Sequence, residues 1–222
     1  MHDDRRGEVI DIADTLRLRL ADETVAILVE EARLLRPIAE RIFSDVCELE
    51  TDGAVNGRGS CLVSGPREAL REFHSGSGLA IAREFAGGRL DVFPTRASYI
   101  FYDAGDYSFF HNDAVHAHIT VLVGLSAGLI PLRLYPEFGR ASRADVDHLN
   151  EIAHIDEDRL SLAMFERFGT RGLHREAEVL EGHALAIRGR RVAHARPRQP
   201  IAGAVVSACY SFLQPPREWQ LA

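Results

Sequence analysis

The 222-residue sequence contains no lysine, and all 26 of its basic residues are arginine. Without lysine the protein cannot form a Schiff base during catalysis. Any permanently charged group that binds a carboxylate must then be a guanidinium, which suits that task because it can bind both oxygens at once. Acidic residues number 33, so the formal net charge is −7. Nucleic-acid-binding proteins usually display a clustered basic surface, and we therefore expect no nucleic-acid partner.

Cysteines and long apolar runs are also scarce. The three cysteines, Cys47, Cys61 and Cys209, have neither paired nor metal-binding spacing, so we expect reduced, packed thiols. No stretch approaches the ~18 apolar residues of a membrane span, and the first residues lack the pattern of a signal peptide. These absences predict a cytoplasmic protein without membrane association.

Length and composition favour one domain. With 46% apolar residues, the chain is long enough to bury one core and short for two, so we expect a single domain over residues 1–222. About residues 1–95 should form a mainly helical support. Strands should follow at about residues 96–136 and 177–213, with a helical insert at residues 137–175 between them.

The support begins with a strand-like segment and a long apolar stripe. Thr15–Leu20 alternates leucine with arginine, which is typical of a half-buried strand. From Asp22 an apolar stripe with helical spacing continues to Val46, and Pro37 within it predicts a kink or two consecutive helices. After a glycine-rich loop, Ser60–Ser64 fits a short strand.

Two further helices should complete the support, one opened by Pro66 and one over Leu79–Phe85 that ends at Gly87 and Gly88. Segments rich in β-branched and aromatic residues then alternate with turn residues, which predicts successive strands. These segments are Ala97–Tyr102, Tyr107–His111, Ala117–Leu125, Ile130–Tyr135, and the stretches HALAIRG, RRVAHAR and AVVSACYSF.

About eight strands in two blocks, with helices at the front, predict an α+β protein with a mainly β core. We expect a double-stranded β-helix of the jelly-roll, cupin-like type. A Greek-key sandwich without a metal fits the strand count as well. The insert at residues 137–175 is charged on one side and apolar on the other, and we expect it to be a mobile cover over the mouth of the barrel.

His111 and Asp113 are the strongest candidates for chemistry. If the strand continues through both, their side chains leave the same face, as residues i and i+2 of a strand do. Two ligands are too few for a metal site, and the best third candidate is the distant His194. Two histidines and one carboxylate form the facial triad of non-haem Fe(II) oxygenases. Zinc accepts the same ligands and is the rival metal.

At these residues the sequence resembles the Fe(II)/2-oxoglutarate-dependent oxygenases, and within them the branch that looks like prolyl 4-hydroxylase. The family elements occur in the family order over about a third of the chain. They read Tyr102, Gly105-Asp106, Tyr107, His111 with Asp113, ITVLVGLS, PLRLYPE, EGHALAIRG and His194.

The resemblance implies an oxidoreductase, a dioxygenase in which His111, Asp113 and His194 hold Fe(II). In that family the cosubstrate 2-oxoglutarate chelates the iron and leaves one position for O2. Its oxidative decarboxylation gives succinate, CO2 and an oxidant for an unactivated C–H bond. The resemblance also implies that the hydroxyl of Tyr102 helps to hold 2-oxoglutarate.

The sequence departs from the family at the cation that binds the 5-carboxylate of 2-oxoglutarate. Relatives carry arginine or lysine about ten residues after the distal histidine, where this chain has Gly203, Ala204, Val205 and Val206. Our first candidate for a replacement is Arg133, on a neighbouring strand. Arg196 and Arg198 share the strand period of His194 and are the alternatives.

The leading hypothesis is an oxygenase that acts on a small molecule, such as an amino acid or an intermediate of a specialised metabolite. Asp113 argues against a halogenase, because halogenases of this family have a small residue in its place. Two other hypotheses are a peptidyl hydroxylase of the same family and a noncatalytic jelly-roll metal-binding protein. The sequence does not determine the oligomeric state.

Overall fold

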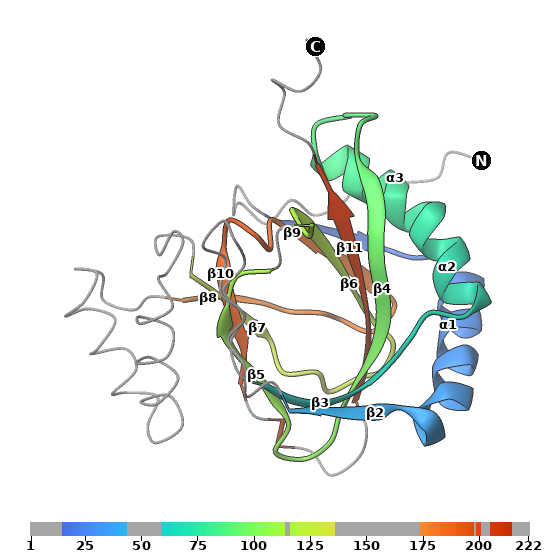
Figure 1. Cartoon of the computed structure of the whole chain (residues 1–222), viewed down its shortest axis with the longest axis vertical. Helices are drawn as coiled ribbons and strands as arrows, with labels where there is room; N and C mark the ends of the chain where they lie inside the picture. Colours follow the sequence, from blue (N-terminus) through green and yellow to red (C-terminus); the bar gives the residue numbers. More distant parts are fainter. Residues whose placement is uncertain are drawn as a thin grey trace, which may run out of the picture.

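The computed structural model of the chain describes residues 15–43, 59–113, 116–135, 174–197, 199–200 and 205–214. These residues form a curved, mainly β structure with helices packed on one side (Figure 1). The helices are α1 (Asp22–Leu35), the 3-10 helix η1 (Arg36–Ile38), α2 (Glu68–Ser75) and α3 (Ser77–Phe85). The strands are β1 (Thr15–Arg19), β2 (Glu40–Phe43), β3 (Gly59–Ser64), β4 (Phe93–Tyr102), β5 (Tyr107–His111), β6 (Ile119–Gly124), β7 (Leu132–Tyr135), β8 (Arg175–Ala177), β9 (His183–Ile187), β10 (Ala193–Arg196) and β11 (Val205–Leu213).

The strands form one antiparallel sheet that folds into two walls. Its order is β1-β9-β6-β11-β4-β3-β5-β10-β7-β8, and β2 adds to β3. The major wall consists of β1, β9, β6, β11 and β4, and the minor wall of β5, β10, β7 and β8. Strand β3 joins them because it pairs with both β4 and β5. From β4 onward the chain repeatedly crosses between the walls, so the predicted double-stranded β-helix is confirmed.

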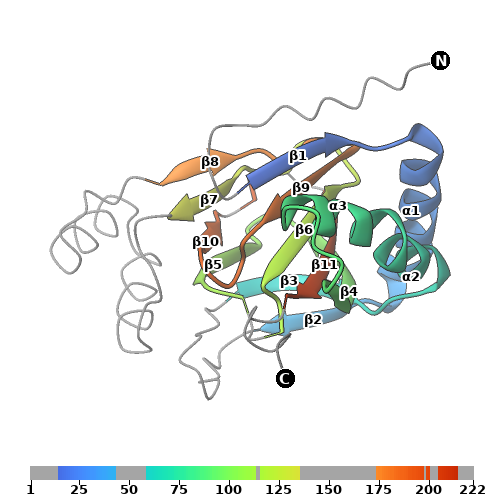
Figure 2. The same ribbon diagram turned by 90° about the horizontal axis from the view of Figure 1, so that it is seen from above.

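At the opposite side, the two ends of the sheet approach each other without a strand pair. Strand β1 lies near the end of β8 (Figure 2), where Nη2 of Arg17 donates a 3.0 Å hydrogen bond to the carbonyl oxygen of Glu178. The same nitrogen lies 3.9 Å from the Glu178 carboxylate. A side chain therefore bridges the seam between β1 and β8.

Each face of the major wall packs against a different layer. Alternate residues of β6 such as Val121 and Val123 point outward toward the helices, whereas Leu122 points inward. The outer cluster includes the aromatic residues Phe73, Tyr99, Phe101, Tyr210 and Phe212. Burying an apolar side chain of this size contributes roughly 1.5–3 kcal/mol, so this face fixes the helices on the sheet.

A single carboxylate connects α1 and α2 to the sheet. Glu31 of α1 accepts hydrogen bonds from the backbone N–H groups of Ala69 (2.9 Å) and Leu70 (3.0 Å) in the first turn of α2. It also accepts one from the hydroxyl of Tyr99 on β4, at 2.8 Å. An anion at a helix N-terminus satisfies free N–H groups and is favoured by the helix dipole. Burial, and next the bond to Glu31, raise the pKa of Tyr99, which therefore stays protonated.

The structure confirms two consecutive helices at Pro37 and corrects the apolar stripe that follows. Helix α1 ends at Leu35, and Pro37 lies in η1. The segment Glu40–Phe43 is not helical but forms strand β2, which pairs with β3. Residues 44–46 of the predicted stripe lie outside the described part of the chain. Over a few residues an apolar pattern fits helix and strand equally well, and pairing with β3 decides between them.

Two other boundaries differ from the prediction. Strand β4 begins at Phe93, within the segment assigned to the helical support. Strand β8 begins at Arg175, at the end of the predicted helical insert. The insert's other residues lie outside the described part of the chain, except His174. Among the described helices, none combines the length and apolar character needed to cross a membrane.

Candidate metal centre

Three predicted ligands converge between the walls. His111 is the last residue of β5, and His194 lies directly opposite it on β10. Their ring centroids are 4.3 Å apart. Asp113 follows two residues after His111, and the ligand atoms of all three residues lie within 4.8 Å of one another. Within the described residues, this is the one cluster of three or more side chains that could hold a metal ion.

One carboxylate oxygen faces both imidazoles. Oδ1 of Asp113 lies 3.8 Å from Nε2 of His111 and 3.6 Å from Nε2 of His194. Three ligand atoms at these separations can enclose one ion while leaving its opposite side open, as a facial triad requires. The donor set therefore fits Fe(II), and it fits zinc equally well.

Backbone contacts orient His194 for metal binding. Its Nδ1 lies 2.9 Å from the carbonyl oxygen of Val192 and can bond to it only as a donor, so in the neutral imidazole Nε2 carries the lone pair and faces Asp113. His194 is 5% exposed. Nδ1 of His111 lies 3.5 Å from the hydroxyl oxygen of Ser108. The Nε2 atoms of both imidazoles are thus the ones that face the carboxylate.

The charges within the triad oppose the effect of burial. Burial alone would raise the pKa of Asp113, but the charge of His194 and its hydrogen bond, followed by His111 and Thr120, lower that pKa to about 2. For His194, burial lowers the pKa, but the Asp113 carboxylate outweighs burial and raises it overall. Asp113 is therefore an anion at neutral pH and is ready to bind a cation.

The position of Asp113 has a different cause from the one predicted. Strand β5 ends at His111, so the two side chains do not share a face through strand alternation. Instead, the N–H of Asp113 donates a 3.0 Å hydrogen bond to the carbonyl oxygen of Gly189. The intervening Asn112 is 2% exposed and its amide donates to the carbonyl oxygen of Arg190, at 3.3 Å. The turn after β9 thus places the carboxylate.

Two residues in contact with Asp113 were not predicted as part of the site. The hydroxyl of Thr120 donates to Oδ2 of Asp113, so the second carboxylate oxygen is held while Oδ1 faces the imidazoles. A Cβ at Gly189 would collide with Oδ2 of Asp113 and lie 2.8 Å from Oγ1 of Thr120. In the sequence a threonine at this position is typical of strand filling, and the register of β6 shows that Thr120 faces the site.

Arg196 is the predicted cation that the structure places on the same face as the triad. It lies two residues after His194 on β10 and is only 2% exposed. Its Cζ is 5.2 Å from the ring centroid of Tyr102, and Nη1 donates to the carbonyl oxygen of Ile130. Nε is buried without a hydrogen-bond partner, and no ion pair joins Arg196 to a carboxylate in the described chain.

Tyr102 is buried beside this guanidinium. Burial raises the pKa of Tyr102 to about 12, with the nearby Arg196 opposing the effect, so the tyrosine is a neutral hydroxyl. A buried, uncompensated guanidinium is costly, and an anion beside it would offset that cost. The pair Arg196 and Tyr102 thus offers a charged donor and a hydroxyl at one point of the interior.

Arg133 lies on the other face of the minor wall. It pairs directly with Ala195 of β10, whereas His194 pairs with Leu134. Directly opposed residues of antiparallel strands point to the same side, so Arg133 points away from the face that carries His194 and Arg196. This register argues against our first candidate for the carboxylate anchor. Arg198 lies outside the described residues.

The histidines that follow the motif are not part of the triad. His116 is exposed, and its carbonyl oxygen accepts a 3.1 Å hydrogen bond from the hydroxyl of Thr95. Nδ1 of His118 accepts one from the backbone N–H of Gln214, at 3.3 Å. Neither imidazole belongs to the cluster of candidate ligands.

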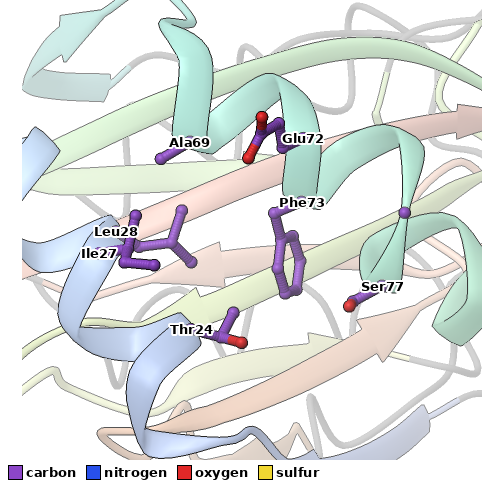
Figure 3. Close-up of a pocket in the computed structure, with 8 residues that line it drawn as sticks. Thr24, Ile27, Leu28, Ala69, Glu72, Phe73 and Ser77 are labelled. Carbon is purple, nitrogen blue, oxygen red and sulfur yellow. The ribbon is translucent and has the colours of Figure 1, made fainter.

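A separate groove lies among the helices. It has a volume of about 230 Å³ and is lined by Thr24, Ile27, Leu28, Ala69, Glu72, Phe73, Gly76 and Ser77 (Figure 3). Leu28 and Phe73 belong to the cluster on the outer face of the major wall. The triad lies on the inner face, so this groove is not part of the candidate metal centre.

Solved structures share this arrangement of strands. A prolyl-4-hydroxylase from Pseudomonas putida matches with a TM-score of 0.56 and 12% identity, over 91% of this chain and 94% of the other. The two chains therefore share the double-stranded β-helix fold. The non-haem alpha-ketoglutarate-dependent epimerase SnoN, from nogalamycin biosynthesis, gives a TM-score of 0.60 at 13% identity, over 91% and 77% of the two chains.

A third neighbour is a prolyl hydroxylase from Trichoplax adhaerens in complex with a peptide of hypoxia inducible factor. It has a TM-score of 0.58 and 13% identity, over 91% of this chain and 84% of the other. SnoN is also known in complex with Fe3+, alpha ketoglutarate and nogalamycin RO. No protein-family model and no curated protein sequence matches the chain. The likeness therefore concerns the fold, and it extends over most of the chain.

Proposed function

We propose that the protein is an Fe(II)/2-oxoglutarate-dependent oxygenase that oxidises a C–H bond of a small molecule, with succinate and CO2 as coproducts. One observation carries the proposal: the His-Asp-His triad shares the interior with a buried guanidinium that has no carboxylate partner among the described residues. A metal-binding protein without a cosubstrate has no need for such a cation. An enzyme that binds a dicarboxylate beside its metal does.

His111, Asp113 and His194 would hold the iron through the two Nε2 atoms and Oδ1. Iron with 2-oxoglutarate and O2 supplies oxidative chemistry that no side chain can perform. The low pKa of Asp113 keeps a full negative charge at the ion. Thr120 occupies Oδ2 of Asp113, so the carboxylate would bind through one oxygen and leave the remaining positions for small ligands.

Arg196 and Tyr102 would bind the 5-carboxylate of 2-oxoglutarate. Arg196 reaches the interior from the strand that carries His194, which places the cation closer in sequence to the metal ligand than the family pattern does. Its bond to the carbonyl oxygen of Ile130 holds the guanidinium in place before a ligand arrives. A positioned donor loses little conformational entropy on binding, and this favours affinity.

The apolar residues of the interior would keep water away from the reaction. The inner cluster consists of Leu122, Leu132, Leu134, Ala177, Val179, Leu185, Ile187 and Val192. Leu134 is directly paired with His194, and Ile187 with Thr120. A dry environment strengthens the charge interactions within the triad and protects reactive species from side reactions.

Anaerobic titration tests the proposal. Adding Fe(II) and then 2-oxoglutarate to the metal-free protein should produce the visible charge-transfer absorption of the chelate, and air should then convert 2-oxoglutarate to succinate. A protein that binds zinc without catalysis would give neither signal. Failure to bind Fe(II), or binding without the chelate band, would contradict the proposal.

A peptidyl hydroxylase is the second candidate, because the Pseudomonas and Trichoplax neighbours are prolyl hydroxylases. We favour a small molecule because SnoN, whose complex contains nogalamycin RO, fits the same fold. Succinate release stimulated by free amino acids and small metabolites, compared with proline-containing peptides, separates the two candidates.

A further inference from the structure

The inner face of the major wall carries Arg96 at the end of the barrel where the proposed metal ligands lie. On β4, Arg96 and Ser98 share the face of Tyr102, because they are separated from it by even numbers of residues. Arg96 pairs with Ser211 of β11, and Ser211 pairs with Thr120 of β6. Arg96, Ser211 and Thr120 thus form one row across three adjacent strands.

This row leads directly to the metal centre. Thr120 donates to the carboxylate of Asp113, and two strand spacings separate it from Arg96, roughly 10 Å between backbones. A long guanidinium side chain covers most of that distance. The next row inward lies on the same face of the sheet and consists of Ser98, Cys209 and Leu122. Burial raises the pKa of Cys209 to about 12, and the charges of Asp113, Arg96 and Arg196 all act on this thiol.

Arg96 and Arg196 differ in exposure. Arg196 is buried next to Tyr102, which is six residues beyond Arg96 along β4. Six residues of a strand span roughly 20 Å, so the two cations occupy opposite ends of the interior. Arg96 is exposed. The inner end therefore suits a cosubstrate, and the exposed end suits a molecule that arrives from solvent.

Arg96 has no partner within the described part of the chain, neither an ion pair nor a side-chain hydrogen bond. Other arginines do pair: Arg36 lies 2.7 Å from the carboxylate of Asp103, and Arg33 lies 2.7 Å from that of Glu30. The neighbours of Arg96 in its row and the next are the small residues Ser98 and Ser211. A ligand could therefore reach the guanidinium without displacing a large side chain.

We propose that Arg96 binds a carboxylate group of the organic substrate and thereby holds that substrate over the open side of the metal centre. The proposal rests on the oxygenase function proposed above and names its substrate class, small carboxylic acids. A guanidinium binds a carboxylate through two parallel hydrogen bonds. One guanidinium matches a single negative charge, which favours a carboxylate over a phosphate dianion.

Acetate is a suitable probe because it carries the carboxylate alone. The protein is loaded with Mn(II) and saturated with N-oxalylglycine, an unreactive analogue of 2-oxoglutarate that occupies the cosubstrate site. Enhanced relaxation of the acetate methyl protons then reports acetate held near the metal. Acetamide, which has the same shape without the charge, serves as the matched ligand and should show no enhancement.

Four proteins are compared: the parent, Arg96→Gln, Arg96→Lys and Arg71→Gln. Arg71 is an exposed arginine of α2, on the helical side of the major wall, and its replacement removes the same charge far from the site. We expect acetate affinity to fall about 5- to 10-fold in Arg96→Gln, to be largely retained in Arg96→Lys, and to be unchanged in Arg71→Gln. Equal enhancement in the parent and Arg96→Gln, or none in the parent, would overturn the proposal.

The same preparations distinguish this failure from failure of the proposed function. Each protein is also titrated with Fe(II) and 2-oxoglutarate under anaerobic conditions. If the chelate band is normal but acetate relaxation is equally enhanced in the parent and in Arg96→Gln, the role of Arg96 is overturned and the oxygenase function stands. Absence of the band in the parent would overturn both.

Discussion

The side chains of His194 and Arg196 leave the same face of β10, two residues apart, so that one strand carries both a proposed metal ligand and a buried cation. Only 2% of Arg196 is exposed, and its guanidinium lies over the ring of Tyr102. In the proposed function, the geometry of a single strand would therefore set the positions of both metal and cosubstrate. The two residues are distinct, so mutation can test their roles separately.

Replacing Arg196 with Gln should weaken 2-oxoglutarate binding by roughly ten- to a hundredfold, because a charge-assisted pair in a dry interior contributes on the order of 1.5 to 3 kcal/mol. Iron affinity should change little, since Arg196 does not touch the triad. The measurement is the 2-oxoglutarate concentration dependence of the chelate band. Arg133→Gln is the matched control and should behave like the parent; the reverse pattern would restore Arg133 as the anchor.

Replacing His111, Asp113 or His194 with Ala should abolish Fe(II) binding and turnover, because three protein ligands leave little redundancy. The control is His116→Ala, which removes an exposed imidazole close in sequence and should leave iron binding intact. Equilibrium dialysis followed by metal analysis measures the loss. A full chelate band in Asp113→Ala would contradict the ligand assignment.

Replacing Thr120 with Val should weaken metal binding by about 10- to 100-fold, the usual cost of removing a group that orients a ligand. Valine has nearly the same shape but cannot donate to Oδ2 of Asp113. Thr120→Ser retains the hydroxyl and should recover most of the affinity. Fe(II) titration of the three proteins provides the comparison, and equal losses in Val and Ser would mean that packing, not the hydrogen bond, is responsible.

The metal-free protein should respond to pH through the triad. The folded-state pKa of His194 is raised, so its contribution to stability is fully present below its unfolded value of about 6.5 and is lost as pH rises through the folded pKa. The pKa of Asp113 is lowered to about 2, so its contribution is present above about pH 4 and is lost as pH falls toward 2.

Denaturant unfolding of the apoprotein between pH 6 and pH 9 should therefore show a decline in the free energy of unfolding that His194→Gln lacks. Fe(II) should reverse the trend, because metal binding requires a neutral imidazole and competes with protons at low pH. An apoprotein whose stability rises across this range, with no difference from His194→Gln, would contradict the charge coupling within the triad.

Much of the fold, and the three residues of the triad, could be predicted from the sequence. The patterns used were either local in the sequence or depended on the order of motifs along the chain. The segments of β1, β5 and α3 match their predicted boundaries closely, since alternation and glycine caps are read within a few residues. The three candidate ligands were chosen from their types and order, and the structure brings them together. The reason given for their proximity was wrong, since Asp113 depends on Gly189, which is distant in sequence.

The choice between two arginines for the proposed carboxylate anchor shows what the sequence could not provide. Arg133 and Arg196 both lie on strands with an inward-facing side, and their side chains can be assigned only when the register between β7 and β10 is known. Register depends on packing across the interior, which local patterns do not encode. The role of Thr120 was missed for the same reason.

The bridge between Arg17 and Glu178 has a consequence for how the molecule assembles. These residues are 161 positions apart, and β1 finds its strand partner only in β9. Contacts of such long range are slow to form, because a large loop must close before they stabilise anything. During synthesis, β1 therefore stays without its strand partner until the residues of β9 have been made. Closure of the barrel at this seam is then a late event in folding.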